Sequence, residues 1–243
     1  MDIDIEIILI EQDSARKIDI DTLPSNCEYV FAYNEGLFNR AWGLNVGFRH
    51  SSGKAIAFAD NDVVVDREIL QDSFTLCSDE YDYDAIKPFN KLIDMTEKES
   101  GRILGSGRPL DSLQFKGKNI RAGISFCSAL TVFRRNAYEQ IGGYDERFVG
   151  WGGEDDAMSR FKIPLLKKAY VVEGNAYHLW HERSVNDSGF QPNYKNNLRL
   201  LWQYYSYSTE DILQLCEKSR LGFGRLKNGD GKQVHRSNKG SNL

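Results

Sequence analysis

The chain has 243 residues, of which 41% are hydrophobic and 27% charged, so it is long enough to bury the core of one large α/β domain. Its formal net charge of −4 argues against a general electrostatic grip on nucleic acid or on an acidic membrane surface. No apolar run reaches the roughly 18 residues that a membrane-spanning helix needs, and the first residues lack the basic region of a signal peptide, so we expect a cytoplasmic protein without a membrane span.

Five segments are rich in apolar or β-branched residues and are short enough to be strands. They cover residues 3–10, 28–33, 55–60, 82–89 and 123–133. The run AIAFAD, at 55–60, has the apolar character of a fully buried parallel strand. Between and after these strands, apolar residues recur at helical spacing. The predicted helices cover 38–53, 66–80, 134–143, a segment that begins at Glu154, and 194–218.

Strands that alternate with helices predict an α/β fold with a mostly parallel, doubly wound sheet flanked by helices. The polar stretch 90–119 is weakly periodic and is predicted to be a long loop, which in a compact domain is usually functional or mobile. From residue 222 the composition turns to Gly, Lys, Asn and Ser. We therefore expect one domain over 1–221 and a flexible C-terminal tail over 222–243.

The four cysteines lie far apart in the sequence and form no CxxC pair. They are Cys27, Cys77, Cys127 and Cys216. This spacing favours buried free thiols over a disulfide framework or a zinc site.

The motif ADND places Asp60 and Asp62 at the carboxyl end of a predicted strand, where open α/β sheets bind ligands. Two carboxylates one residue apart repel each other unless a cation lies between them, and Mg²⁺ or Mn²⁺ suits carboxylate oxygens together with a substrate phosphate. The alternative is a simple turn, because Asp and Asn are favoured where strands end.

The motif HLWH contains His178 and His181, three residues apart. On a helix both side chains would lie on one face, and in an extended segment they would lie on opposite faces. Imidazole is a common metal ligand, and a mixed Asp and His site prefers Mn²⁺ to Mg²⁺ because nitrogen suits softer ions. The alternative is a pair of core histidines with Trp180 packed beside them.

The motif GWGGEDD joins an aromatic residue and glycines to three carboxylates. Gly150, Gly152 and Gly153 permit unusual backbone torsions and close approach to a ligand. Glu154, Asp155 and Asp156 would form the first turn of a helix, where negative charge is favoured for structural reasons alone. That explanation leaves Trp151 unexplained, whereas a tryptophan beside carboxylates can hold a sugar, and one carboxylate can accept a proton from a hydroxyl nucleophile.

Taken together, FNRAWGLNVGFRHSSGKAIAFADND, FVGWGGEDDAMSRF and HLWH resemble the metal-dependent beta-4-galactosyltransferases in order and rough spacing. The resemblance covers about residues 28–195 and extends to the wider inverting family 2 glycosyltransferases and the chondroitin-type polymerases of polysaccharide biosynthesis. It implies a GT-A fold and transfer of a hexose or N-acetylhexosamine from a UDP-sugar to a glycan hydroxyl, with Mn²⁺, or alternatively Mg²⁺, as cofactor.

The resemblance also implies a role for each matching residue. Asp62 and His181 would bind the metal, with His178 in the place of the family's methionine. Asp155 would be the catalytic base, and Asp60 would lie near the ribose or the metal. Glu154 and Trp151, with Gly152 and Gly153, would shape the acceptor and donor sugars, and Phe38 and Arg40 would flank the uracil.

Two departures from the family pattern leave other interpretations open. The family begins with an extra strand and a loop that hold the nucleotide base, and this chain lacks that strand unless IEIILIEQD, residues 5–13, replaces it. A partner chain could complete the nucleotide site, or the protein could be a catalytically silent module that binds nucleotide sugars or glycans. A nucleotidyltransferase is disfavoured, because no glycine-rich phosphate loop is present.

Overall fold

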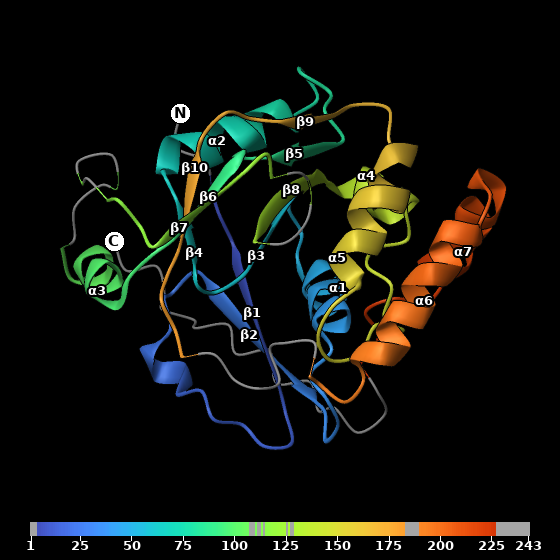
Figure 1. The fold of residues 1–243 in the computed structure, drawn as a ribbon, viewed down its shortest axis with the longest axis horizontal. Coiled ribbons are helices and arrows are strands. Elements are labelled where there is room, and N and C mark those ends of the chain that lie inside the picture. The colour runs from blue at the N-terminus through green and yellow to red at the C-terminus, as the bar shows by residue number, and fades with distance from the viewer. Residues whose placement is uncertain are drawn as a thin grey trace, which may run out of the picture.

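The structure, a computed structural model, describes residues 4–106, 110, 113, 115–124, 126, 129–182 and 190–226. Within these residues the strands form one two-stranded sheet and two four-stranded sheets, with helices packed around them (Figure 1). The α/β class predicted from the sequence is confirmed. No described helix is both long enough and apolar enough to cross a membrane.

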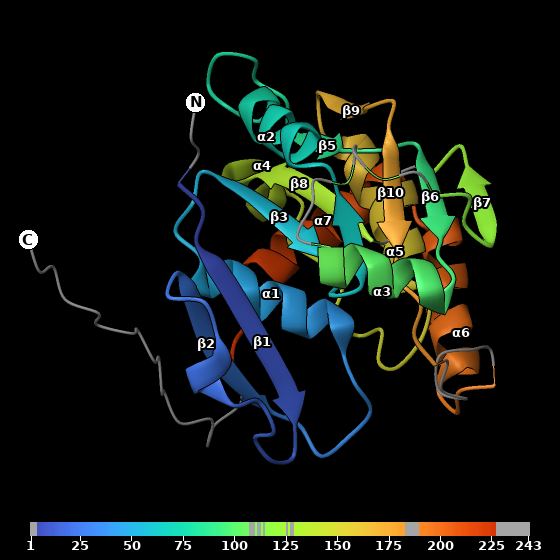
Figure 2. The same ribbon diagram turned by 90° about the vertical axis from the view of Figure 1, so that its left-hand side faces the viewer.

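The N-terminal sheet consists of β1 (Ile7–Asp13) and β2 (Cys27–Tyr33), which pair in parallel beside α1 (Arg40–His50), as Figure 2 shows. Apolar residues of β1 and β2 pack against Trp42 and Val46 of α1. At the carboxyl end of β1, the Gln12 side chain accepts a hydrogen bond from the backbone N–H of Asn39 at 2.6 Å and donates one to its carbonyl at 2.9 Å. Asn39 then caps α1 by accepting from the N–H of Trp42. These contacts set where α1 begins.

The two larger sheets are mixed, so the expectation of a mostly parallel sheet is wrong. One sheet has the order β3 (Ala55–Ala59), β8 (Leu130–Arg134), β5 (Ala85–Lys87), β9 (Ala169–Val171). The other has the order β4 (Val63–Val65), β10 (Asn175–His178), β6 (Lys91–Asp94), β7 (Asn119–Ala122). β8 runs antiparallel to both β3 and β5, which puts the predicted parallel strand AIAFA beside an antiparallel neighbour. Alternation along the chain does not determine which strands become neighbours, because that depends on long-range packing.

The helices differ from prediction mainly at their ends. Besides α1, those longer than one turn are α2 (Arg67–Leu76), α3 (Glu97–Ser106), α4 (Arg135–Gln140), α6 (Tyr194–Ser206) and α7 (Thr209–Arg220). The short α5 (Glu154–Ala157) continues directly into a π turn (Met158–Lys162) and a 3₁₀ turn (Ile163–Leu165), and a further 3₁₀ turn spans Ile20–Thr22.

Two of the segment predictions are corrected by the described residues. The segment 194–218 forms two helices, because Ser208 starts α7 with a capping box in which Ser208 and Asp211 exchange hydrogen bonds. The stretch 90–119, predicted as a loop, contains β6 and α3. β6 has 4 residues and α3 has 10, so each is too short to give a clear periodic signal among the polar residues around it.

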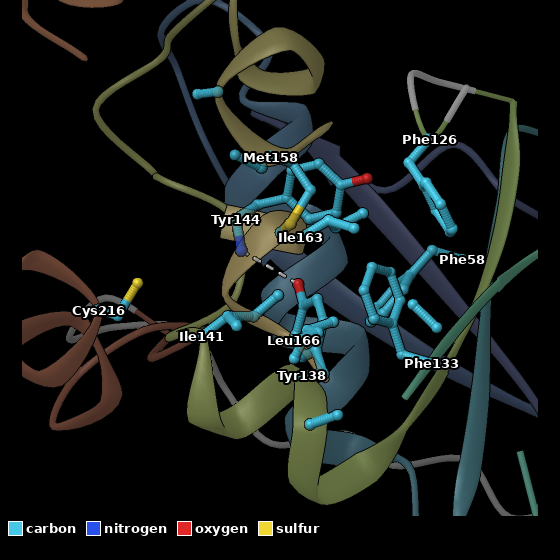
Figure 3. Packing of buried hydrophobic residues seen from close by; sticks show 14 of the residues in the cluster. Phe58, Phe126, Phe133, Tyr138, Ile141, Tyr144, Met158, Ile163, Leu166 and Cys216 are labelled. Carbon is cyan, nitrogen blue, oxygen red and sulfur yellow. Dashed lines mark hydrogen bonds between the residues drawn. The ribbon is translucent and has the colours of Figure 1, made fainter. Parts of the chain in front are cut away.

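The largest core cluster is aromatic and lies between α1, α4 and the sheet of β3 and β8 (Figure 3). Tyr138 is its centre, with ring centroids 4.5 Å from Phe58 and 5.0 Å from Phe48. The Tyr138 hydroxyl donates to Asn45 of α1 at 2.6 Å, so the one polar atom of this ring is satisfied. Cys216 of α7 belongs to the same cluster.

The last described residues, 222–226, fall within the segment predicted as a tail and pack on the domain. Phe223 is buried in the aromatic core cluster, and the carbonyl of Arg225 accepts a hydrogen bond from the Trp42 indole at 3.0 Å. Residues 227–243 lie outside the described residues.

Three of the cysteines fit the free-thiol prediction. Cys77 and Cys216 are buried, Cys27 is half-buried, and all three are free thiols. Cys127 lies outside the described residues.

Candidate functional site

Asp60 sits directly after β3 and is held on both sides. Its backbone N–H donates to the carbonyl of Ala129 at 2.7 Å, and the N–H of Ala129 donates to Asp60 Oδ2 at 3.0 Å. The Arg40 guanidinium donates to Asp60 Oδ1 through Nε at 2.9 Å and Nη2 at 2.7 Å. The turn after β3 thus fixes this carboxylate against the first residue of α1.

Arg40 also connects this turn to the GWGGEDD motif. Its Nη1 donates to Asp155 Oδ1 at 3.0 Å and lies 4.0 Å from Glu154 Oε1. The guanidinium is well buried, so these contacts are screened little by water. One cation therefore joins Asp60 to Glu154 and Asp155, two adjacent carboxylates that come more than ninety residues later in the sequence.

The loop over residues 149–153, called the WGG loop below, depends on glycine for its backbone conformation. Gly150, Gly152 and Gly153 have φ values of +76°, +92° and +100°, a region that side chains rarely adopt. Gly153 is the residue before α5, and a Cβ there would lie 2.6 Å from the Phe148 ring. The N–H of Gly150 donates to the Phe38 carbonyl at 2.8 Å, which brings the FNRA segment beside this loop.

The buried Asn197 of α6 holds the same loop from the other side. Its Nδ2 donates to the carbonyls of Val149 and Trp151, both at 3.0 Å. Tyr194, at the start of α6, places its ring 5.2 Å from that of Trp151, and Trp151 itself is 43% exposed. Two contacts therefore position the exposed indole of Trp151: the hydrogen bond from Asn197 to the Trp151 carbonyl and the packing of the Tyr194 ring.

Glu154, Asp155 and Asp156 form the first turn of α5 but differ in their surroundings. Glu154 is buried, and its Oε2 has no hydrogen-bond partner among the described residues. Burial, together with the neighbouring charge of Asp155, raises the pKa of Glu154 to about 7. Asp156 is more exposed and accepts a hydrogen bond from Arg160 one turn later at 2.9 Å.

Asp62, His178 and His181 form a second cluster. Asp62 Oδ2 lies 3.4 Å from His178 Nε2 and 3.3 Å from His181 Nε2, and one ligand atom of each residue lies within 4.8 Å of the others. The hydrogen bond between Asp62 and His178 lowers the pKa of Asp62 and raises the pKa of His178. β4 and β10 pair so that Val63 faces His178, which sets Asp62 next to the histidine. A carboxylate oxygen and two imidazole nitrogens at this separation fit a divalent ion such as Mn²⁺.

The two clusters open into one cavity of about 450 Å³. Its lining includes Asp60, Arg121, Trp151, the whole run Gly152–Asp156, both histidines, and Tyr194, Leu198 and Leu201 of α6. A second cavity of about 500 Å³ is also lined by the two histidines, together with Asp94, Lys118 and Trp180. Phe38 lines neither cavity and is 58% exposed, and Arg40 and Asp62 contact lining residues without being part of the lining.

Several residues of this site were not singled out from the sequence. They are Asp94, Arg121, Tyr194 and Asn197. Tyr194 and Asn197 lie in a segment recognised only for its helical spacing, and Asp94 and Arg121 flank a stretch without a motif. The available signals were the positions of Tyr194 and Asn197 on a predicted helix after the histidine motif. They did not identify the site, because the contacts of both residues with the loop at 149–151 form only in the folded protein.

Comparison with known proteins places similar sequences among glycosyltransferases. A family model described as the N-terminal domain of galactosyltransferase matches residues 115–163, which include the GWGGEDD motif. Human chondroitin sulfate N-acetylgalactosaminyltransferase 1 is 27% identical over 177 residues, and the mouse protein of that name is 26% identical over 191 residues. Each comparison covers 69% of this chain, and the chain spans about a third of the length of these relatives. The resemblance to galactosyltransferase-like glycosyltransferases that the motifs predict is confirmed.

Two solved structures of Drosophila beta1,4-galactosyltransferase 7 also align with the chain, both at 17% identity. The catalytic domain in complex with xylobiose gives a TM-score of 0.39 and covers 69% of this chain and 65% of that one. A variant in complex with manganese, UDP-Gal and xylobiose gives 0.38 and covers 79% and 74%.

Proposed function

We propose that this chain, which is similar to galactosyltransferase-like enzymes, is a metal-dependent inverting glycosyltransferase. It moves a hexose or N-acetylhexosamine from a UDP-sugar to a hydroxyl group of a glycan. The observation that carries this proposal is the shared cavity, in which the carboxylates beside Trp151 face the same space as the two histidines that contact Asp62. A sugar platform, a proton acceptor and a set of metal ligands are the parts that such a transfer needs.

Asp62, His178 and His181 would hold the divalent ion. Two nitrogen ligands favour Mn²⁺ over Mg²⁺. When bound, the ion stabilises the negative charge of the departing diphosphate. The protein contributes the position of these ligands at the ends of β4 and β10, next to the acidic motif of α5.

Asp155 is the catalytic base of the proposal. As the acceptor oxygen forms a bond to the anomeric carbon, the bond from that carbon to the UDP oxygen breaks and the hydroxyl proton passes to the Asp155 carboxylate. Arg40 Nη1 donates to Asp155 Oδ1 at 3.0 Å and holds this carboxylate in place at the cavity. Attack from the side opposite to the leaving group inverts the configuration at the anomeric carbon.

The remaining residues bind the two substrates. Trp151, supported by Tyr194, offers an aromatic face to the apolar side of a sugar ring. Glu154 contributes a buried oxygen, Oε2, that has no hydrogen-bond partner in the described part of the chain and can accept from a sugar hydroxyl. In this proposal Asp60 and Arg40, which form an ion pair, act on the donor side, and Phe38, which is exposed, would offer its ring to the uracil.

Transfer assays on Asp155→Asn and Asp156→Asn test the base. The two side chains are neighbours of equal charge, but Asp156 pairs with Arg160. We expect Asp155→Asn to lower kcat by roughly 10²–10⁴-fold, the usual contribution of a general base, with UDP binding nearly unchanged and Asp156→Asn close to the parent. Equal activity of Asp155→Asn and the parent would remove Asp155 from this role.

Calorimetric titration of UDP with Mn²⁺, and then with EDTA, tests the donor site separately. We expect binding only with Mn²⁺, and its loss in Asp62→Asn. Binding without transfer to any acceptor would favour a silent nucleotide-sugar module instead. Absence of binding under both conditions would contradict a complete donor site within this chain.

A further inference from the structure

One register line of the β4–β10–β6–β7 sheet runs through the histidine cluster. Val63 pairs with His178, His178 pairs with Asp94, and Asp94 pairs with Asn119. Residues paired across neighbouring strands point to the same face of the sheet and lie about 5 Å apart. The sheet itself therefore sets Asp94 beside His178, on the side opposite to Asp62.

The side chains of His178 and Asp94 are in contact as a result of this strand pairing. His178 Nδ1 lies 3.1 Å from Asp94 Oδ1, and both side chains are largely buried. An ionised carboxylate only accepts hydrogen bonds, so the proton of this contact belongs to Nδ1. Nε2 faces Asp62 at 3.4 Å and donates to it when the imidazole carries a second proton. When that second proton is absent and Nδ1 stays protonated beside Asp94, the lone pair is on Nε2, on the side of Asp62.

We propose that Asp94 is a positioning residue of the metal centre, which holds His178 in the tautomer and ring orientation that direct Nε2 toward the ion. This inference rests on the proposed function, since it concerns the metal named there. Histidine ligands usually donate their second N–H to a carboxylate or carbonyl, which orients the ring and makes it a more basic ligand.

Asp94 is itself held in place by two donors from β7. Arg121 Nη2 donates to Oδ1 at 2.7 Å, and Asn119 Nδ2 donates to Oδ2 at 3.2 Å. Both carboxylate oxygens thus have partners, and their positions are set by strand pairing. Side chains that are locked in this way hold a ligand to the tolerance that a metal site needs.

His181 is supported differently. Its Nδ1 lies 3.1 Å from the carbonyl of Glu182, the next residue, and its side chain is 41% exposed. A neutral carbonyl polarises the ring less than a carboxylate does. Of the two histidines, His178 is therefore the one whose ligand strength depends on a residue from another strand.

The competing explanation is that Asp94 only pairs with Arg121 to join β6 to β7. The variants Asp94→Asn and Arg121→Gln separate the two roles, because both break the ion pair and only the first removes the carboxylate from His178. Asp94→Glu keeps the charge. Melting curves of the metal-free variants show whether each one folds.

Mn²⁺ affinity, measured from the electron paramagnetic resonance signal of free Mn²⁺, is the first readout. We expect Asp94→Asn to weaken Mn²⁺ binding by about 10–100-fold, Asp94→Glu to weaken it less, and Arg121→Gln to have a small effect. Equal affinity of Asp94→Asn and the parent would overturn the inference, and so would an equal loss in Arg121→Gln.

The second readout is the ¹⁵N spectrum of the histidines in metal-free protein at a pH where imidazole is neutral. The chain has 4 histidines, so the signals can be assigned by substitution. We expect His178 to be protonated at Nδ1 in the parent and to lose this preference in Asp94→Asn. An unchanged tautomer would contradict the inference whether or not the metal binds. Failure of the parent to bind Mn²⁺ would count against the proposed function, and the spectrum would still decide what Asp94 does.

Discussion

Arg40 contacts the three carboxylates Asp60, Glu154 and Asp155 of the described site. Its guanidinium makes hydrogen bonds to Asp60 and Asp155 but lies 4.0 Å from Glu154. The three carboxylates carry more negative charge than the one guanidinium can balance. Glu154 lies farthest from the guanidinium and is also the most buried of the three. Glu154 accordingly retains its proton to a higher pH than an ordinary glutamate.

This raised pKa predicts how stability depends on pH. A group whose folded pKa is above its unfolded value binds more protons in the folded state, so its contribution to stability falls as pH rises from the unfolded pKa of 4.5 to the folded pKa of about 7. In Glu154→Gln this loss is absent. We expect the unfolding free energy of the variant, relative to the parent, to rise between pH 5 and pH 7.5 by on the order of 2–3 kcal/mol.

Urea denaturation of the metal-free proteins at several pH values provides the measurement. Asp156→Asn is the control, since that carboxylate is exposed and paired with Arg160. A constant difference between Glu154→Gln and the parent across this pH range would show that Glu154 titrates like an ordinary glutamate.

At the scale of elements, the candidate site depends on how α5 begins. Gly153 adopts φ of +100° as the residue before the helix, and Phe148 packs against it. α6 then fixes the preceding loop through Asn197 and supports Trp151 through Tyr194. The backbone conformation of Gly153 and the contacts from α6, which begins some forty residues later in the chain, therefore set the direction of the acidic turn.

Gly153→Ala tests this dependence. The new Cβ would meet the Phe148 ring at 2.6 Å and would force an unfavourable φ, so we expect a loss of roughly 2–4 kcal/mol in unfolding free energy. Gly101→Ala is the matched control, because Gly101 lies within α3 with no atom within 4 Å of the added Cβ. There we expect a gain of about 0.5–1 kcal/mol. Similar effects at the two positions in urea denaturation would exclude a special role for Gly153.

At the scale of the whole molecule, the aromatic core cluster connects α1, the sheet of β3 and β8, and the C-terminal helices α6 and α7. Phe223 closes it, with ring centroids 5.4 Å from Phe48 and 6.0 Å from Tyr138. The Arg49 guanidinium lies over the same ring, 5.1 Å from its centroid. The segment after α7 therefore helps to hold α1, which carries Arg40, against the rest of the domain.

We expect Phe223→Ala to lower the unfolding free energy by about 3–5 kcal/mol, the usual cost of removing a buried phenylalanine. Leu221→Ala, two residues away and 75% exposed in the parent, should change it by less than about 0.5 kcal/mol. Thermal unfolding followed by circular dichroism measures both. A Phe223→Ala variant as stable as Leu221→Ala would mean that the segment after α7 does not contribute to the core.

Local signals in the sequence were enough to predict the positions of β2, β3, α1 and α2, because periodicity acts within a few residues. The first strand was predicted over 3–10, and β1 begins and ends later, at Ile7 and Asp13. They were not enough to predict strand direction. The reversal of β8 between β3 and β5 depends on packing against distant segments. The interruption between α6 and α7 at Tyr207 could have been predicted, since Ser208 and Asp211 have the spacing of a capping box. The helical spacing of apolar residues on both sides instead indicated one continuous helix.

For the site, the sequence by itself determined the chemistry: which carboxylates follow a strand, which glycines precede an acidic turn, and which two imidazoles lie three residues apart. These are properties of residue type and local spacing. Only the tertiary structure decided what these groups face. Asp62 meets His178 because β4 pairs with β10, Asp94 meets His178 because β6 is the next strand, and Arg40 meets Asp155 because α1 packs beside the WGG loop. Such contacts join residues that are 84 to 116 positions apart in the sequence, and their formation depends on the burial of the whole core rather than on any local pattern.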